Sequence, residues 1–435
     1  MTFVYILISL LSVISYIGRQ YKIFLLCYTS LMTDLFLLDS IGTSIKGTDL
    51  CFLLNFLLLP VALLRRYNEK VDDKKVNNVV RIFLLFIIIE SICTIGSGAE
   101  TLLYSFKVVR VPLMMVGYYA FSLIPLDTYK QYLKIMLYIT IIQSILFLLQ
   151  FIGVDILAGG VESENFEFSY ALNIPTFIYL YIFFVLESEY VKKYKYVLLM
   201  LFIMVLLLTF VRAILLSTVL CLFIYIVFHR GIRRSVYLVF IFLVILPITL
   251  SVVDKKQEAN GTHSSTTEEI RLLFSGIDNI RELGATSGSL IFRMSMLVER
   301  VDYLIENPKF LMLGVGTIHE DSPNCYNRFD FKLGTRNEDK YFGKCLIDSG
   351  DITWVPIVLR YGLLGTLLHL FVLFFIIVQA KKRDDLLKIL CPLFLLFFIK
   401  SFDGPFFERP STYIEIIIYY VLFSRTYLER KKLNI

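Results

Sequence analysis

The sequence predicts an all-α polytopic integral membrane protein with about 12 to 13 transmembrane helices. Of the 435 residues, 57% are hydrophobic and only 18% are charged, which is far more apolar than an ordinary soluble domain. Apolar runs long enough to cross a bilayer recur along the chain, and one polar stretch, from about residue 254 to 351, interrupts them. We expect helices throughout the membrane because unpaired backbone amides cannot face lipid.

The apolar runs divide the chain into three regions, which are N-terminal transmembrane helices (1–252), a large mostly helical loop (253–351) and C-terminal transmembrane helices (352–435). The first run lacks a basic segment and a small-residue cleavage site, so we expect it to be retained as a span. We expect spans over residues 3–17, 21–38, 50–64, 82–96, 105–124, 132–152, 170–187, 196–211, 213–229, 235–252, 352–379, 386–401 and 411–424.

Basic residues are concentrated in short clusters between the apolar runs. The clusters are Arg19/Lys22, Arg65 to Arg81, Lys192/Lys193/Lys195, Arg230/Arg233/Arg234, Lys381/Lys382/Arg383 and Arg430/Lys431/Lys432. The positive-inside rule assigns these clusters to the cytoplasm. The large loop is then extracytoplasmic and the C-terminus cytoplasmic. The net charge of +6 therefore reports orientation, and we expect no nucleic-acid partner.

The large loop contains two patterns typical of amphipathic helices, over residues 268–283 and 289–306. Asn307 and Pro308 end the second. Such helices lie on the membrane or cap the helix bundle. Cys325 and Cys345 also lie in the loop, where an oxidising compartment would allow a disulfide between them.

Four basic residues lie within or at the edge of expected spans, where a charge is costly unless it is paired, hydrated or functional. They are Arg110, Arg212, Arg360 and Lys400. Snorkelling to the interface is the alternative for each. Arg212 is the most informative because it interrupts a continuous apolar stretch at the expected outer surface, where a guanidinium can hold a phosphate by paired hydrogen bonds.

Two loop arginines, Arg293 and Arg300, are seven residues apart and therefore share one face of the expected helix. A phosphate site would use them together. The alternative is a solvated helix face on which Glu299 and Asp302 are their partners.

Three residues are candidates for a general base. His319 lies in a His-Glu-Asp sequence and is suited to proton transfer or metal binding, although a plain surface cluster is the competing interpretation. Asp348 and Asp351 stand just before an expected span. For each aspartate there are two interpretations. It acts as a base at the membrane surface, or it caps the N-terminus of the following helix.

Several segments together resemble a known family. They are TFVRAILLS (209–217), IFRMSMLVERVDYLIENPKFLMLGVG (291–316) with FLMLGVGT (310–317), and SGDITWVPIVLRYGLLG (349–365). Their order is similar to that in the O-antigen polymerase and O-antigen ligase superfamily of bacterial surface-polysaccharide enzymes. The resemblance covers roughly residues 200 to 370. The ligase branch has a histidine shortly before its Tyr-Gly-like motif, whereas this chain has Asp348 and Asp351 there, which favours the polymerase branch.

The resemblance implies a GT-C-like membrane glycosyltransferase. It would polymerise polyprenyl-diphosphate-linked repeat units at the outer face of the bacterial cytoplasmic membrane, without a metal or other cofactor. Membrane lipid and a chain-length regulator are the expected partners. The diphosphate needs cations, and the candidates are Arg212, Arg293, Arg110, Arg300 and Arg360. The acceptor hydroxyl needs a base, for which Asp351, Asp348 and His319 are the candidates.

Other interpretations stay open. An O-antigen ligase is the alternative within the family. A lipid-linked sugar transporter or flippase would also have many spans and buried arginines, but here one loop carries nearly a quarter of the chain and neither half resembles the other. A non-catalytic membrane scaffold ranks third. The glycine pairs Gly314/Gly316 and Gly362/Gly365 are expected to permit tight turns and close helix packing rather than phosphate binding.

Overall fold

The computed structural model describes residues 2–33, 47–69, 74–149, 175, 177–208, 217–222, 225, 289–334, 344, 346–347, 352–379, 385–402, 404 and 406–432. Every regular element in these ranges is helical, as the sequence predicts. The α-helices are α1 (Thr2–Ile17), α2 (Tyr21–Thr33), α3 (Gly47–Glu69), α4 (Lys74–Gly96), α5 (Leu102–Val109), α6 (Gly117–Phe121), α7 (Leu126–Leu149), α8 (Ile178–Glu187), α9 (Lys195–Leu208), α14 (Ser289–Glu306), α15 (Pro323–Arg328), α17 (Trp354–Gln379), α18 (Asp385–Lys400) and α19 (Pro410–Lys432). Short 3-10 turns are η1 (Pro112–Val116), η3 (Glu189–Tyr194), η4 (Pro308–Phe310) and η5 (Phe406–Glu408).

Four of the described helices are long and apolar enough to cross a membrane, namely α3, α4, α7 and residues 354–375 of α17. Shorter apolar helices are found in α1, α2, α8 and α18. The polarity of the side chains is reversed relative to a soluble protein, because α4 exposes Ile88, Ile89 and Ile92 while it buries Glu90 and Thr94. These features identify a helical membrane protein.

Most helix limits follow the apolar pattern of the sequence. The loop helix α14 occupies residues 289–306, as predicted, and it packs against α17, so it caps the bundle. The expected single span over residues 105–124 is instead divided into α5, η1 and α6. The division occurs where Pro112 begins η1, because proline cannot donate the hydrogen bond that a continuous helix requires.

Arginines from two distant segments, α3 and α19, lie at one end of the bundle. Arg65 donates to the carbonyl oxygens of Tyr16 and Ile17 at 3.0 and 2.8 Å. Arg66 donates to the Ser122 hydroxyl, and Arg425 donates to the Ser122 carbonyl oxygen. The ends of α1, α3, α6 and α19 therefore lie together. Arg65 and Arg66 belong to one of the predicted basic clusters, and Arg425 precedes another, Arg430/Lys431/Lys432.

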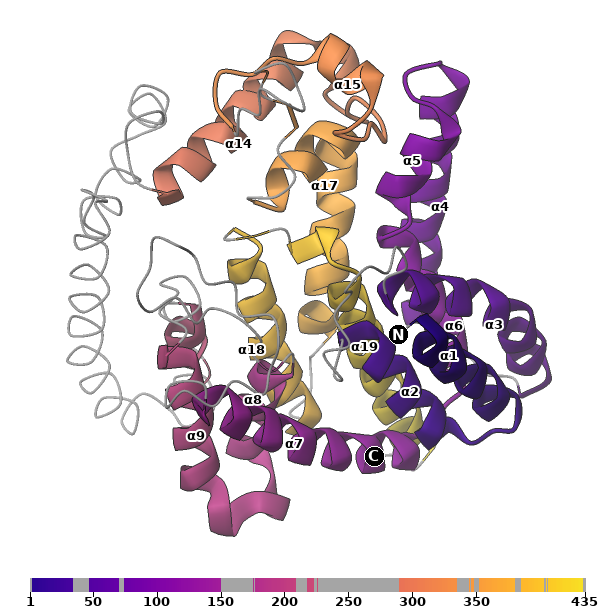
Figure 1. The fold of residues 1–435 in the computed structure, drawn as a ribbon, viewed down its shortest axis with the longest axis vertical. Coiled ribbons are helices and arrows are strands. Elements are labelled where there is room, and N and C mark those ends of the chain that lie inside the picture. The colour runs from indigo at the N-terminus through magenta and orange to yellow at the C-terminus, as the bar shows by residue number, and fades with distance from the viewer. Residues whose placement is uncertain are drawn as a thin grey trace.

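The opposite end carries α14 and α15 above α17, beside the hairpin of α4 and α5 (Figure 1). Helices α18 and α19 lie beside α17, and α7 runs crosswise to them in this view (Figure 1). The segment that follows α14 returns to the bundle between α17 and the α4–α5 hairpin, where it contacts both. That contact builds the candidate site.

Candidate functional site

Helix α17 is broken at Gly362, and another segment of the chain occupies the break. Gly362 has φ 59° and ψ −161°, which no α-helix contains. The backbone N–H groups of Leu363 and Leu364 donate to the carbonyl oxygens of Leu311 and Met312 at 2.9 and 3.0 Å. Residues 311–316 therefore insert into the backbone hydrogen-bond ladder of α17. We call residues 311–316 the inserted segment.

The other half of the broken ladder is satisfied by the same segment. The carbonyl oxygens of Leu359 and Arg360 accept from the backbone N–H groups of Val315 and Gly316 at 2.9 and 3.0 Å. In a continuous helix these two carbonyls would serve residues 363 and 364. The inserted segment thus replaces two intrahelical bonds with four bonds between segments.

Glycine is required where the two backbones meet. A Cβ atom on Gly314 would lie 2.3 Å from the Arg360 carbonyl oxygen, and one on Gly362 would lie 2.5 Å from the Gly314 nitrogen. A Cβ atom on Gly316 would lie 2.3 Å from the Thr94 hydroxyl oxygen. All three glycines have positive φ angles. The expectation that these glycines permit tight turns and close packing is confirmed.

Hydroxyl groups fasten the end of the inserted segment to the α4–α5 hairpin. The Thr317 amide donates to the Thr94 hydroxyl at 3.0 Å, and the Thr317 hydroxyl lies 2.6 Å from that of Ser105. The Ser105 hydroxyl is in turn 2.9 Å from that of Ser91. Small hydroxyl side chains of this kind hold membrane helices together.

Arg360 is buried next to the residues that join the inserted segment to the α4–α5 hairpin. Its Nε donates to the Ile318 carbonyl oxygen at 3.0 Å, and its Nη1 pairs with the Glu408 carboxylate at 2.8 Å. Arg360 therefore ties the end of the inserted segment to η5 between α18 and α19. Its role as a diphosphate ligand stays a prediction, and any phosphate there would compete with Glu408.

His319 directly follows Ile318, whose carbonyl oxygen accepts from Arg360. Its backbone amide donates to the Glu100 carboxylate at 3.2 Å, while its Nδ1 accepts the Asp321 amide N–H at 3.0 Å. Burial, followed by the positive charge of Arg360, lowers the pKa of His319 to about 4. The neutral ring then carries its proton on Nε2. In this arrangement His319 is a hydrogen-bond donor at Nε2 rather than a ready proton acceptor.

Glu90 was not singled out by the sequence interpretation. It lies inside α4, where its side chain is only 6% exposed, and its carboxylate makes no hydrogen bond or ion pair with the described residues. One turn further along α4, the Thr94 hydroxyl donates to the Glu90 carbonyl oxygen at 2.8 Å. The signal in the sequence is a carboxylate within an apolar run, which marks a functional candidate by default.

Arg300 on α14 is fully buried, so the solvated-face interpretation is wrong for this residue. Its Nη1 pairs with Glu299 at 2.7 Å, its Nη2 donates to the Leu346 carbonyl oxygen at 3.0 Å, and its guanidinium lies 4.0 Å from the Phe331 ring centroid. Glu299, the expected partner, is confirmed. Arg300 therefore holds loop segments against α14 in this structure.

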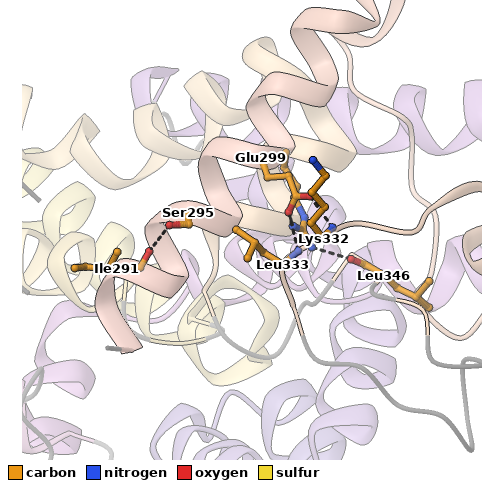
Figure 2. Close-up of polar contacts among 7 residues, drawn as sticks. Ile291, Ser295, Glu299, Lys332, Leu333 and Leu346 are labelled. Carbon is orange, nitrogen blue, oxygen red and sulfur yellow. Dashed lines mark hydrogen bonds and ion pairs between the residues drawn. The ribbon is translucent and has the colours of Figure 1, made fainter. Parts of the chain in front are cut away.

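Glu299 completes the same arrangement, which Figure 2 shows around the middle of α14. Its carboxylate accepts the backbone N–H groups of Lys332 and Leu333 at 2.7 and 3.1 Å. One carboxylate thus fixes the turn of the chain that follows α15. The buried face of α14 is a packing surface that orders the loop.

The other candidate arginines among the described residues are Arg293 and Arg110. Arg293 is partly buried near the start of α14, two turns before Arg300. Arg110 is half-exposed at the end of α5, where it pairs with Asp49 at 2.7 Å. The role of Arg293 and Arg110 as diphosphate ligands stays a prediction.

Several predictions fall outside the described residues. These are Arg212, Asp348, Asp351, Cys345 and the amphipathic helix over residues 268–283. Cys325 is a buried free thiol, and burial raises its pKa to about 12. The disulfide with Cys345 that the sequence allows is therefore not formed by Cys325 in this structure.

These contacts define the candidate site. The inserted segment, His319, Arg360 and the α4–α5 hairpin form one connected group at one end of the bundle, and the group includes two of the segments on which the family resemblance depends. Comparison of the sequence with protein-family models and with curated proteins finds no match.

Proposed function

We propose that this protein is a membrane glycosyltransferase that polymerises polyprenyl-diphosphate-linked oligosaccharide repeat units of a bacterial surface polysaccharide. The observation that carries the proposal is the direct pairing of the Gly314-Val-Gly316 segment with the Arg360-Tyr-Gly362 segment. These segments lie far apart in the sequence, and the family resemblance depends on both. Their contact explains why two such segments would occur together in one chain.

The proposed chemistry needs no metal and no nucleotide sugar. The reducing end of one lipid-linked glycan is the electrophile, a hydroxyl of a second glycan attacks it, and polyprenyl diphosphate leaves. Arginine side chains stabilise the negative charge that develops on the leaving diphosphate. Arg212 and Arg293 are the first candidates for this role, with Arg110, Arg300 and Arg360 behind them.

The attacking hydroxyl has to lose a proton. Asp351 is the first candidate for the base, and Asp348 is the second. We rank His319 third because its Nδ1 already accepts the Asp321 amide N–H. Its Nε2–H is better suited to donate a hydrogen bond to a substrate oxygen. General-base assistance of this kind is worth roughly 100- to 10,000-fold in rate.

The location follows from the substrate. We propose that the protein lies in the bacterial cytoplasmic membrane, with a GT-C-like arrangement of about 12 to 13 spans and the large loop outside. Lipid-linked repeat units are available at that face. A chain-length regulator is the proposed protein partner.

A transporter of lipid-linked sugars is the second candidate, and the break in α17 favours it. Discontinuous helices with exposed backbone ends form substrate sites in many transporters. Here, however, the inserted segment satisfies the freed carbonyls of Leu359 and Arg360. The broken ends are therefore occupied, which makes an ion or substrate site at this break the weaker proposal.

Deletion of the gene, followed by a ladder gel of surface polysaccharide, tests the proposal. We expect single-repeat material. Full-length polymer stranded on the lipid carrier would instead indicate a ligase, and repeat units trapped in the cytoplasm would indicate a flippase. A normal ladder would contradict all three functions.

Complementation with arginine variants tests the roles of individual residues. We expect Arg212→Ala and Arg293→Ala to abolish the ladder at normal expression, and lysine to restore it poorly because lysine cannot form paired hydrogen bonds to phosphate. Arg81→Ala is the matched control, since Arg81 is an exposed arginine at the start of a predicted span. A normal ladder from both alanine variants would assign these arginines a structural role.

A further inference from the structure

The inserted segment presents three consecutive apolar side chains to the surroundings. Leu311, Met312 and Leu313 are 36%, 54% and 47% exposed. They belong to the region that the sequence assigns to an aqueous loop. Three large apolar side chains in a row are unfavourable in water even when half-exposed, because full burial of such a side chain is worth roughly 1.5 to 3 kcal/mol and about half of that remains to be gained here.

These side chains continue the exposed surface of α17. Leu311 and Met312 accept hydrogen bonds from Leu363 and Leu364, which are themselves exposed. Leu367 extends the exposed face by a further turn. The helix belongs to a candidate membrane span. The exposed side chains of residues 311–313 and those of Leu363, Leu364 and Leu367 therefore form one continuous apolar surface on a membrane-spanning element.

The depth of the inserted segment follows from its contacts with α4. Next to the Met312–Gly362 contact, Gly365 packs on the Phe86 ring of α4, and at the other end of the segment Gly316 packs on Thr94. Between these two levels α4 exposes Ile88, Ile89 and Ile92. The inserted segment thus lies beside a stretch of α4 whose exposed residues are these three isoleucines and Cys93.

Helix α5 extends this surface on the far side of the junction. Its exposed side chains include Leu102, Leu103 and Phe106. Apolar surfaces therefore flank the inserted segment on α17, α4 and α5. If the inserted segment lay in water, the apolar surfaces directly beside it on these helices would lie in water as well.

The backbone of the inserted segment meets part of the condition for entering a bilayer. Non-helical backbone is tolerated at membrane depth only where its polar groups are satisfied by protein. Four backbone hydrogen bonds to α17 satisfy the carbonyl oxygens of Leu311 and Met312 and the N–H groups of Val315 and Gly316. The N–H groups of Leu311 and Gly314 donate to the carbonyl oxygens of Pro308 and Phe310. Among the described residues the N–H groups of Met312 and Leu313 have no backbone partner, so these two amides belong near the interface, where water reaches them. Directly before it the chain becomes polar, with Glu306, Asn307 and the exposed Lys309. Lys309 lies where the membrane–water interface would be, and its long side chain can extend toward the lipid headgroups.

We propose that residues 311–313 enter the lipid bilayer as a re-entrant segment, with Leu311, Met312 and Leu313 in contact with phospholipid acyl chains. The aqueous loop then consists of two parts on either side of this segment. The occupant of the apolar surface is lipid because the surface is continuous with the exposed face of α17. The inference is independent of the proposed catalytic function.

Tryptophan quenching by brominated phospholipids tests this inference in reconstituted full-length protein. The chain has a single tryptophan, Trp354, which is buried and donates to Ser401 at 2.7 Å, so its background quenching should be low. In Met312→Trp, we expect acyl-chain-brominated lipid to quench the added fluorescence. The loss should match that of Leu367→Trp, a variant on the exposed face of α17.

Asn327→Trp is the matched control in the aqueous part of the loop, because Asn327 is exposed on α15. It should show only the background loss of the wild-type protein. Leu313→Trp provides a second reporter if Met312→Trp does not fold. Quenching of the reporter no stronger than that of Asn327→Trp would overturn the proposal, and would mean that water or another part of the protein covers Leu311 to Leu313.

Discussion

The nitrogen that accepts the Asp321 amide determines what His319 can do. With Nδ1 occupied and the pKa lowered to about 4, the ring is neutral at pH 7 and offers an N–H group at Nε2. The sequence alone identified His319 as a candidate base, but it could not supply this hydrogen bond. A residue two positions away has changed the expected role from proton acceptor to hydrogen-bond donor.

The shifted pKa of His319 predicts a pH dependence of stability. The pKa is 6.5 for the unperturbed side chain and about 4 in the folded protein. Between these values the unfolded chain binds a proton that the folded protein does not, so stability falls as the pH decreases from about 6.5 to 4. The side chain is 22% exposed, so about 2 kcal/mol is the upper expectation for the loss between pH 7 and 5.

The measurement is the unfolding midpoint of detergent-solubilised protein at pH 7 and pH 5. His319→Asn should reduce the difference between the two midpoints, because its side-chain oxygen can still accept the Asp321 amide but does not titrate in this range. An equal difference in the variant and the wild type would show that other groups cause the pH dependence.

Other residue-level roles could not be read from the sequence for the same reason. The seven-residue spacing of Arg293 and Arg300 predicts a shared helix face, but not that Arg300 is fully buried against Phe331 and Leu346. Periodicity reports which residues share a face. It does not report which tertiary partner that face meets.

At the scale of elements, the junction of α17 with the inserted segment depends on two glycines. Gly314 and Gly362 have φ angles of +80° and +59°, and a Cβ atom on either would approach the opposite backbone to 2.3 or 2.5 Å. Backbone atoms cannot move aside as a flexible side chain can. The junction should therefore tolerate no side chain at either position.

We expect Gly314→Ala and Gly362→Ala each to destabilise the protein by at least about 2 kcal/mol, since a strained backbone conformation alone costs about 1 to 3 kcal/mol. The matched control is Gly96→Ala at the end of α4, where nothing lies within 4 Å of the added Cβ atom. It should remain within about 0.5 kcal/mol of the wild type. Thermal unfolding of purified protein measures all three. A Gly362→Ala midpoint equal to that of Gly96→Ala would contradict the described junction.

Helices were predictable from the sequence because each buries or exposes a continuous apolar face. The limits of α14 followed from its amphipathic spacing and from Asn307-Pro308. The break in α17 was not predicted, although its glycines were noted, because hydropathy is insensitive to backbone hydrogen bonds. The residues that cause the break lie about fifty positions earlier in the chain.

For the whole molecule, the basic clusters predict a cytoplasmic C-terminus. Arg65, Arg66 and Arg425 belong to different parts of the chain and lie at the same end of the bundle. A tag after Ile435 should therefore be protected from protease added to intact cells. A tag inserted within residues 335–343 should be cleaved. Cleavage of the C-terminal tag in intact cells would reverse the topology.

The inserted segment also has a mechanical consequence. It acts as a brace between parts of the chain that are far apart in sequence, because it is bonded to α17 on one side and, through Thr317, to the α4–α5 hairpin on the other. Rocking of one part against the other would have to break or stretch these bonds. The four backbone bonds to α17 alone are worth roughly 2 to 6 kcal/mol together. We therefore expect α4, α5 and α17 to behave as one stiff frame, with any conformational change confined to other parts of the molecule.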